Sequence, residues 1–217
     1  MKYNTYIFDF DFTLADASTG IIQSANYALG QLGFHAREPD TIKKTIGMTV
    51  FDIFSVLTGV QDEKLAEQFV THFMSMADKV MTDNTILFDD TISVLRRLKE
   101  DGFAVAIVTT KYRYRIDESL KKYDITDLVD YIVGGEDVSA AKPSPEGLLK
   151  AIAHLGARAS SMLYIGDSLI DANAAKNAAI DFAAVTTGTT PMSDFLPLPH
   201  VCIARSLTEI ISSVADL

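Results

Sequence analysis

The sequence lacks the features of a secreted or membrane-spanning protein. It contains a single cysteine, Cys202, so no disulfide can form within the chain, which favours a reducing compartment. Its first six residues, Met-Lys-Tyr-Asn-Thr-Tyr, do not resemble the apolar region of a signal peptide. No run approaches the roughly 20 apolar residues that a membrane span needs. We therefore expect a cytoplasmic protein that does not bind membranes.

Positive charge is also in short supply. The chain has 19 lysine and arginine residues against 29 aspartate and glutamate residues, which gives a net charge of −10. Such a chain repels nucleic acid and anionic lipid, so we expect neither as a partner. A phosphorylated substrate would be repelled in the same way at long range. If the protein binds phosphate, it must do so through a local cation, a lysine or backbone N–H groups.

Histidine and cysteine, the residues most often found at transition-metal and thiol sites, show no pattern that indicates such a site. The four histidines are scattered without the spacing of metal ligands, and we assign them no role. Cys202 lies in an apolar run with no base nearby, so we expect a core residue rather than a nucleophile. The histidines are His35, His72, His154 and His200.

Short apolar runs alternate with helical patterns along most of the chain. The runs are hydrophobic nearly throughout, as expected for parallel strands covered on both faces. This alternation predicts βαβ units and an open, doubly wound, mostly parallel α/β sheet. The expected strands are 6–8, 104–108, 131–133, 162–165 and 182–185, and the expected helices are about 90–101, 113–123, 145–156, 169–178 and 206–214.

One region interrupts that alternation. Between the first strand and about residue 88, apolar residues recur at helical spacing and no strand is evident. We therefore expect residues 16–82 to form an inserted helical domain, and residues 1–15 and 83–217 to form the core domain. The alternative is that these helices simply pack on the sheet.

Polar side chains follow the expected strands. Ligands of open α/β sheets bind at the carboxyl ends of the strands, so these side chains should converge at one edge. The candidates are Asp9 and Asp11 after the first strand, Thr109 and Thr110 after the second, Lys142 in the loop after the third, and Asp167 with Asp171 after the fourth.

This set of residues suits phosphoryl transfer. Carboxylates gathered at one place repel each other, and a hard divalent cation such as Mg²⁺ resolves the repulsion. The cation attracts a phosphate group, which Lys142 and the Thr109 hydroxyl can hold. One carboxylate can then attack phosphorus to give an aspartyl-phosphate, while a second acts as acid and base.

Each candidate also has a purely structural explanation. Asp9 and Asp11 could be turn residues, and Lys142 could be a solvated loop lysine. Against the latter, Pro143 restricts Lys142, and Ser144-Pro145 indicates the N-cap and first residue of a helix. The segment Ser168-Leu-Ile-Asp171 fits a capping box, so Asp171 could serve only the helix.

Four motifs in order resemble the phosphatase branch of the haloacid dehalogenase superfamily. They are Asp9-x-Asp11-x-Thr13-Leu14, Val108-Thr-Thr-Lys111, Lys142-Pro143 and Gly166-Asp-Ser-x-x-Asp171. The resemblance implies a Rossmann-like core with a helical cap inserted after the first strand. It implies that Asp9 is the nucleophile and Asp11 the acid and base, and that Thr109 and Lys142 hold phosphate, with Thr110 beside them. It further implies Mg²⁺ bound by Asp9, Asp167 and the main-chain carbonyl of Asp11, with Asp171 supporting the metal's waters or Lys142.

The helical insert and the segment Thr45-Ile-Gly-Met-Thr49 look like those of phosphoglycolate-phosphatase-type members. One departure is Phe12, where the family usually has glycine. Candidates for substrate contacts are Asp16 and Ser18 on the tether, Lys43, Lys44 and Gly47 in the insert, and Tyr112, Arg113, Tyr114 and Arg115, which could instead begin a surface helix.

We therefore expect a Mg²⁺-dependent phosphatase that hydrolyses small phosphorylated metabolites through an aspartyl-phosphate. Phosphoglycolate and sugar phosphates are both candidate substrates. The alternatives are a β-phosphoglucomutase-like phosphosugar mutase, a pyrophosphatase and, more remotely, a non-catalytic ligand-binding module. The sequence is compatible with a monomer or a homodimer.

Overall fold

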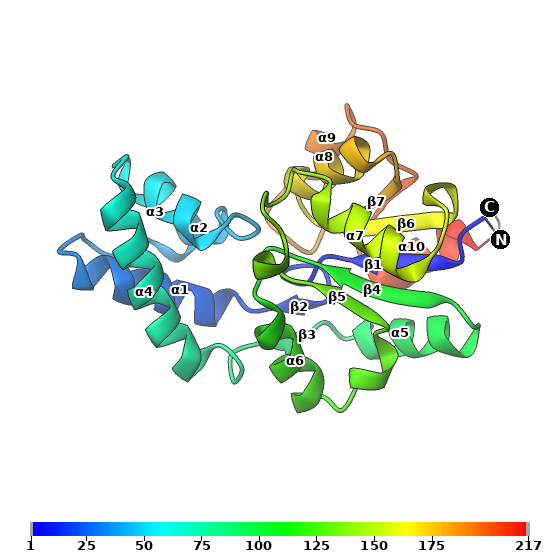
Figure 1. The fold of residues 1–217 in the computed structure, drawn as a ribbon, viewed down its shortest axis with the longest axis horizontal. Helices are drawn as coiled ribbons and strands as arrows, with labels where there is room; N and C mark the ends of the chain where they lie inside the picture. Colours follow the sequence, from blue (N-terminus) through cyan, green and yellow to red (C-terminus); the bar gives the residue numbers. More distant parts are fainter. Residues whose placement is uncertain (1, 216–217) are drawn as a thin grey trace. The chain divides into compact units, whose positions relative to one another are not determined.

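Six parallel strands form the main sheet of the computed structural model, which describes residues 2–215 (Figure 1). The spatial order is β5-β4-β1-β6-β7-β8, which confirms the predicted α/β class. In the register of the central strands, Phe8 pairs with both Ile107 and Ile165, so the residues that follow β1, β4 and β6 emerge at the same edge. The strands are β1 (Thr5–Phe8), β4 (Ala104–Val108), β5 (Tyr131–Val133), β6 (Met162–Gly166), β7 (Asp181–Val185) and β8 (Cys202–Ala204).

Helices cover both faces of this sheet. Successive strand residues point to opposite faces, so Tyr6 and Phe8 belong to one core while Ile7 belongs to the other. The first core is completed by α5 (Thr91–Glu100), α6 (Arg113–Lys122) and α10 (Leu207–Val214). The second is completed by α7 (Glu146–Leu155), α8 (Leu169–Ala178) and α9 (Met192–Phe195).

The chain divides into two compact units. The first consists of Met1–Ala15 and Leu87–Leu217, and the second of Asp16–Ile86. The chain passes between them through β2 (Ala15–Asp16) and β3 (Ile86–Leu87), which pair with each other. These strands were not predicted, because two residues are too few to show an alternating pattern.

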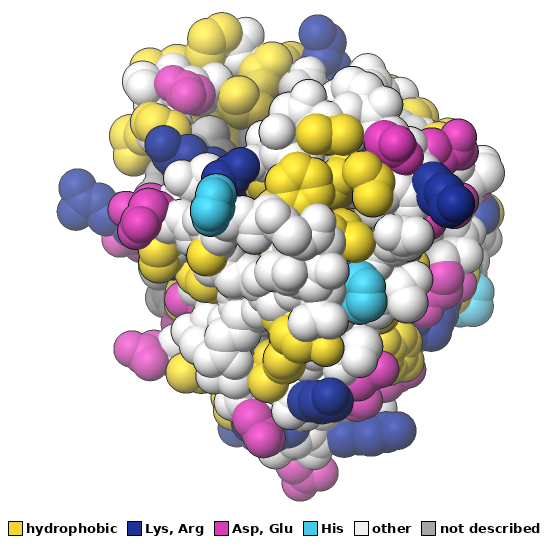
Figure 2. All heavy atoms as spheres, turned by 90° about the vertical axis from the view of Figure 1, so that its left-hand side faces the viewer, with side chains coloured by type: hydrophobic (Ala, Val, Ile, Leu, Met, Phe, Trp, Pro, Cys, Tyr) yellow, Lys and Arg dark blue, Asp and Glu magenta, His cyan; other side chains and the backbone are white. Residues whose placement is uncertain are grey.

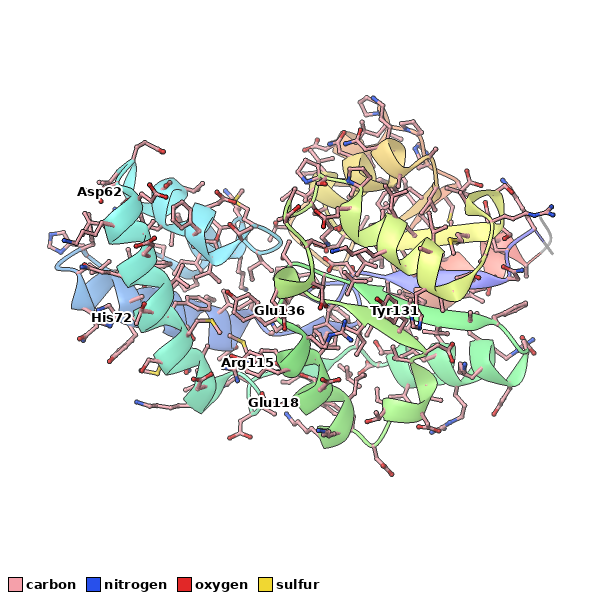
Figure 3. The ribbon with its side chains drawn as sticks, in the orientation of Figure 1. Asp62, His72, Arg115, Glu118, Tyr131 and Glu136 are labelled. Carbon is pink, nitrogen blue, oxygen red and sulfur yellow. The ribbon has the colours of Figure 1, made fainter. Side chains whose placement is uncertain are left out.

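The second unit is helical and has its own apolar core. Its helices are α1 (Ser18–Gln31), α2 (Pro39–Lys43), α3 (Val50–Thr58) and α4 (Glu63–Val80). Thr49 caps α3 and Asp62 caps α4, each through a side-chain oxygen that accepts a backbone N–H. Figure 3 labels Asp62 at the start of α4. The rings of Phe54, Phe69 and Phe73 pack in sequence inside the unit, so α3 and α4 are held by aromatic contacts.

Three local features differ from expectation. Helix α7 begins at Glu146 with Pro145 as its N-cap, so the assignment of Ser144 as N-cap and Pro145 as first helical residue was wrong by one position. The physical reason is that Ser144 lies in a turn, although its hydroxyl still accepts the N–H of Glu146 at 3.3 Å. The short elements α9 and β8 were not anticipated, and neither were the single-turn helices Thr126–Leu128, Gly135–Asp137 and Ala159–Ser161.

Cys202 lies in β8, half-buried against the first core, as expected for a residue that packs. Among residues 2–215, each helix is too short or too polar to cross a bilayer. The face drawn in Figure 2 carries apolar patches among acidic and basic side chains that are interspersed rather than sorted by sign.

The aromatic core of the helical unit gives a test of its stability. Phe69 is fully buried, so Phe69→Ala should destabilise the protein by about 3–5 kcal/mol through lost apolar burial and a residual cavity. The neighbouring Gln68→Ala, at an exposed position on the same helix, should change stability by less than about 0.5 kcal/mol. Urea unfolding followed by circular dichroism measures both, and similar midpoints for the two variants would contradict this packing.

Candidate active site

Three carboxylates meet at the carboxyl edge of the sheet. Asp9 follows β1, Asp167 follows β6, and Asp171 lies in the first turn of α8. Their exposed fractions are 2%, 6% and 0%, and one oxygen from each lies within 4.8 Å of the others. Carboxylates that are this close together and this well buried from solvent destabilise one another unless positive charge is added.

Lys142 supplies part of that charge. Its Nζ lies 3.0 Å from Asp9 Oδ1 and 2.6 Å from Asp171 Oδ1. It also donates to the hydroxyl of Tyr164 at 3.0 Å. Burial alone would lower the pKa of Lys142, but Asp171 and Asp9 together raise it above its usual value. The lysine is therefore charged and is held on three sides.

The positive charge of Lys142 does not offset the negative charge of the three carboxylates. Burial raises the pKa of Asp9 to about 6, against the opposing effect of Lys142. Burial, followed by repulsion from Asp171 and Asp9, raises the pKa of Asp167 well above its usual range. Asp9 Oδ1 has no hydrogen-bond partner among the described residues, although Lys142 is near it.

These observations fit a divalent cation. Mg²⁺ prefers carboxylate oxygens, and three buried carboxylates around a single ammonium offer it ligands. A cation there would restore the ionised forms that burial disfavours. Asp9 and Asp167, which the sequence analysis expected to bind Mg²⁺, both lie in this cluster of carboxylates, together with the Asp171 side chain.

Asp171 serves the helix as well as the site. Its Oδ2 accepts the N–H and the hydroxyl of Ser168, and Ser168 in turn accepts the N–H of Asp171. This is the capping box that the sequence indicated. The other oxygen, Oδ1, faces Lys142 and the Tyr164 hydroxyl. Asp171 therefore caps the helix through one oxygen and contacts Lys142 through the other.

Asp11 points elsewhere. Both of its carboxylate oxygens accept from Lys111 Nζ, each at 2.8 Å. The side chains of Lys111 and Asp11 are only 8% and 12% exposed. Sequence reasoning noted Lys111 after the threonine pair but gave it no role, because nothing in the sequence indicates which carboxylate a lysine will reach.

Thr109, Thr110 and Lys142 line one small cavity of about 10 Å³. Thr109 is buried, and its hydroxyl accepts the N–H of Lys111 at 3.3 Å. The structure thus brings together the three residues expected to hold phosphate, next to the carboxylate cluster through Lys142.

The turn between Asp9 and the first tether is constrained. Phe12 has φ of 59°, a left-handed conformation that costs a residue other than glycine roughly 1 kcal/mol. The turn keeps the shape that glycine would adopt, with the Phe12 N–H donating to Ala15 O at 2.7 Å. The Thr187 hydroxyl donates to the Phe12 carbonyl, so the loop after β7 secures the turn.

Gly188 is a second site residue that the sequence did not reveal. A Cβ built on it would lie 1.9 Å from Asp167 Oδ2. Thr13 holds the other oxygen of that carboxylate, with its hydroxyl 3.4 Å from Oδ1. Asp167 is therefore fixed between a hydroxyl and a bare backbone.

The remaining candidates lie outside this cluster. Tyr112 is the N-cap of α6, and Arg113 begins the helix and pairs with Asp137 at 2.8 Å. Arg115 pairs with Glu118 on the same helix (Figure 3). The segment thus begins a helix, as one of the two explanations expected, but its Arg115 side chain is buried rather than on the surface. Asp16, Ser18, Lys43, Lys44 and Gly47 belong to the second unit, where Asp16 Oδ1 accepts the N–H of Ser18 at 2.7 Å.

Known proteins share this architecture. Residues 6–185 match the family described as haloacid dehalogenase-like hydrolase. The chain is 31% identical to the pyrophosphatase PpaX of Bacillus cereus over 186 residues, which cover 86% of this chain and 84% of that protein.

Solved structures agree. A haloacid dehalogenase-like hydrolase from Bacteroides fragilis superimposes with a TM-score of 0.94 at 44% identity, covering 97% of this chain and 100% of the other. A structure described as a phosphoglycolate phosphatase from Haemophilus somnus superimposes with a TM-score of 0.88 at 20% identity, covering 98% of each chain. The second likeness shows the fold alone.

The contact between Gly188 and Asp167 predicts a severe effect of one added methyl group. Gly188→Ala should destabilise the fold by about 1–3 kcal/mol, because Asp167 or the loop must move. Gly30→Ala is the matched control, since a Cβ there meets nothing within 4 Å and alanine favours helix α1. Urea unfolding compares them, and a Gly188→Ala variant as stable as Gly30→Ala would refute the tight contact.

Proposed function

The chain belongs to the haloacid dehalogenase-like hydrolase family, and we propose that it is a Mg²⁺-dependent phosphatase acting on small phosphorylated metabolites through an aspartyl-phosphate on Asp9. The observation that carries the proposal is the buried cluster of Asp9, Asp167 and Asp171 around Lys142. Three buried carboxylates around one ammonium leave an excess of negative charge, which suits a cation and an anionic ester.

The reaction proceeds in two displacements at phosphorus. A carboxylate oxygen of Asp9 forms a bond to phosphorus while the bond to the leaving oxygen breaks, and Asp11 gives that oxygen a proton. Asp11 then takes a proton from a water molecule, whose oxygen attacks phosphorus and releases Asp9 and inorganic phosphate. Asp9 and Asp167 would hold Mg²⁺, which would supply positive charge to offset the negative charge of the phosphoryl oxygens.

Lys142 and Thr109 hold the group in transfer. Lys142 stays charged because Asp171 and Asp9 face it, so it neutralises a phosphoryl oxygen without a proton transfer. The Thr109 hydroxyl, which lines the same small cavity, donates to another. Positioning and charge neutralisation of this kind do most of the work in phosphoryl transfer.

Two substrate types are candidates. The likeness to the pyrophosphatase PpaX favours pyrophosphate, in which the leaving group is itself a phosphate. The motif resemblance to phosphoglycolate-phosphatase-type members favours phosphomonoesters such as phosphoglycolate or a sugar phosphate. A panel of these compounds, ranked by kcat/KM with Mg²⁺, identifies the preferred one. Release of free phosphate from a hexose phosphate, rather than an isomer, separates hydrolysis from the mutase reaction.

We also propose that the helical unit, Asp16–Ile86, is the cap that the resemblance implies. Its support is its position in the chain, inserted directly after the turn that follows Asp9 and Asp11. Such a cap would shield the aspartyl-phosphate from stray water and provide contacts to the leaving group.

Asp9 is the residue whose loss should stop the reaction. Asp9→Asn removes the nucleophilic oxygen while keeping the shape of the side chain, so hydrolysis of an aryl phosphate should fall by several orders of magnitude with an unchanged circular dichroism spectrum. Asp127→Asn, at an exposed position, is the control and should remain fully active. Turnover by Asp9→Asn at the wild-type rate would exclude this nucleophile.

The role of Mg²⁺ is tested by its removal. Excess chelator should abolish hydrolysis, because the phosphoryl group would then meet an uncompensated carboxylate cluster. Added Mg²⁺ should restore the rate. Activity that survives in chelator at the level of an untreated sample would show that the cluster works without a metal.

A further inference from the structure

Two lysines divide the carboxylates of the site between them. Lys142 faces Asp9 and Asp171, whereas Lys111 faces Asp11 alone among the contacts described above. Resting on the proposed function, we infer that Lys111 is a positioning residue: it keeps the Asp11 carboxyl group where its protonated form can give a proton to the leaving oxygen, and it pairs with the carboxylate that remains.

The ammonium of Lys111 contacts the two carboxylate oxygens of Asp11 equally. Lys111 Nζ is 2.8 Å from both carboxylate oxygens, so the ammonium sits on the bisector of the group and restricts its rotation. Both side chains are almost fully buried, and water therefore competes less for them than it does at a surface ion pair. A carboxylate held at both oxygens loses the rotational freedom that it would have in solvent.

Lys111 is itself anchored to the phosphate end of the site. Its N–H donates to the Thr109 hydroxyl at 3.3 Å, and its carbonyl accepts the N–H of Gly135 at 3.0 Å. Its ammonium also lies 5.9 Å from the centre of the Phe10 ring. Because β1 and β4 are paired neighbours, a lysine fixed at the end of β4 can set the position of a side chain that follows β1.

This placement matters because Asp11 has little else to orient it. It lies in the tight turn whose neighbouring residue Phe12 is left-handed, and its backbone pairs only through an isolated bridge to Ala15. Without the ammonium, the carboxylate would turn toward solvent or away from the leaving oxygen. The ammonium also stabilises the carboxylate that forms when Asp11 gives its proton to the leaving oxygen, so the pair is strongest after the transfer, and Lys111 itself takes part in no bond change.

A leaving-group series distinguishes positioning of the acid from general structural support. The measured quantity is kcat/KM for aryl phosphates of increasing leaving-group basicity, which reports the first displacement. Lys111→Met removes the ammonium and keeps the length of the side chain. It should cost little with the least basic leaving group and up to about 100-fold with the most basic one, since only basic leaving groups need a proton.

Further variants test whether the loss in Lys111→Met arises from the pairing with Asp11. Lys111→Arg should recover most of the loss, because a guanidinium can hold both carboxylate oxygens. In an Asp11→Asn background, Lys111→Met should add no further dependence on the leaving group. Lys99→Met breaks another lysine–aspartate pair, with Asp130 at the opposite end of β4, and should leave the series unchanged. Lys111→Gln serves as a second neutral variant if Lys111→Met does not fold.

Two outcomes would overturn the inference. One is an equal loss for every leaving group, and the other is a loss that persists undiminished in Asp11→Asn. The proposed function is judged separately. If Asp9→Asn keeps full turnover, the phosphatase mechanism fails; if Asp9→Asn is inactive while the Lys111→Met series runs parallel to wild type, only the role of Lys111 fails.

Discussion

The ion pairs of Lys142 with Asp9 and Asp171 are the interaction on which the rest of the site depends. They place one ammonium among three buried carboxylates, and a buried charge is tolerated only when it is paired. The remaining imbalance raises the pKa of Asp9 and Asp167. A site with this imbalance is suited to bind a divalent cation, and through it an anionic ester.

The fold serves this arrangement by aligning strand ends and by removing side chains where space is needed. Because Phe8 is in register with Ile107 and Ile165, the chain leaves β1, β4 and β6 at one edge. A Cβ on Gly166 would lie 2.5 Å from Asp171 Cβ, and one on Gly188 would collide with Asp167. The side chains of Asp167 and Asp171 are thus packed against glycine backbone, which leaves them little room to move.

Much of this could be predicted from the sequence. Continuous apolar runs specify parallel strands, helical periodicity specifies the covering helices, and the coincidence of strand ends specifies which polar residues meet. That reasoning located Asp9, Asp167, Thr109 and Lys142 at one edge. It missed β2 and β3, because two-residue strands show no period, and it also missed β8, although Cys202 was recognised as part of an apolar run.

The direction in which a side chain points could not be predicted from the sequence either. Sequence spacing placed Asp11 beside Asp9, but the direction of its carboxylate depends on the left-handed turn at Phe12 and on Lys111, which lies far along the chain. In the same way, the capping box at Ser168 predicted only one of the two contacts that Asp171 makes. The closeness of Gly188 to Asp167 left no signal, because a single glycine in a loop is compatible with many structures.

The central claim is that the buried carboxylates are arranged around a place for a cation. Titration calorimetry with Mg²⁺ tests it most directly, on the wild-type protein and on the Asp167→Asn and Asp11→Asn variants. The account predicts that wild type binds a single Mg²⁺ ion, that Asp167→Asn binds it at least about 10-fold more weakly, and that Asp11→Asn binds it as wild type does, because the Asp11 carboxylate faces Lys111. Equal affinity in wild type and Asp167→Asn, or no binding by any of the three, would contradict it.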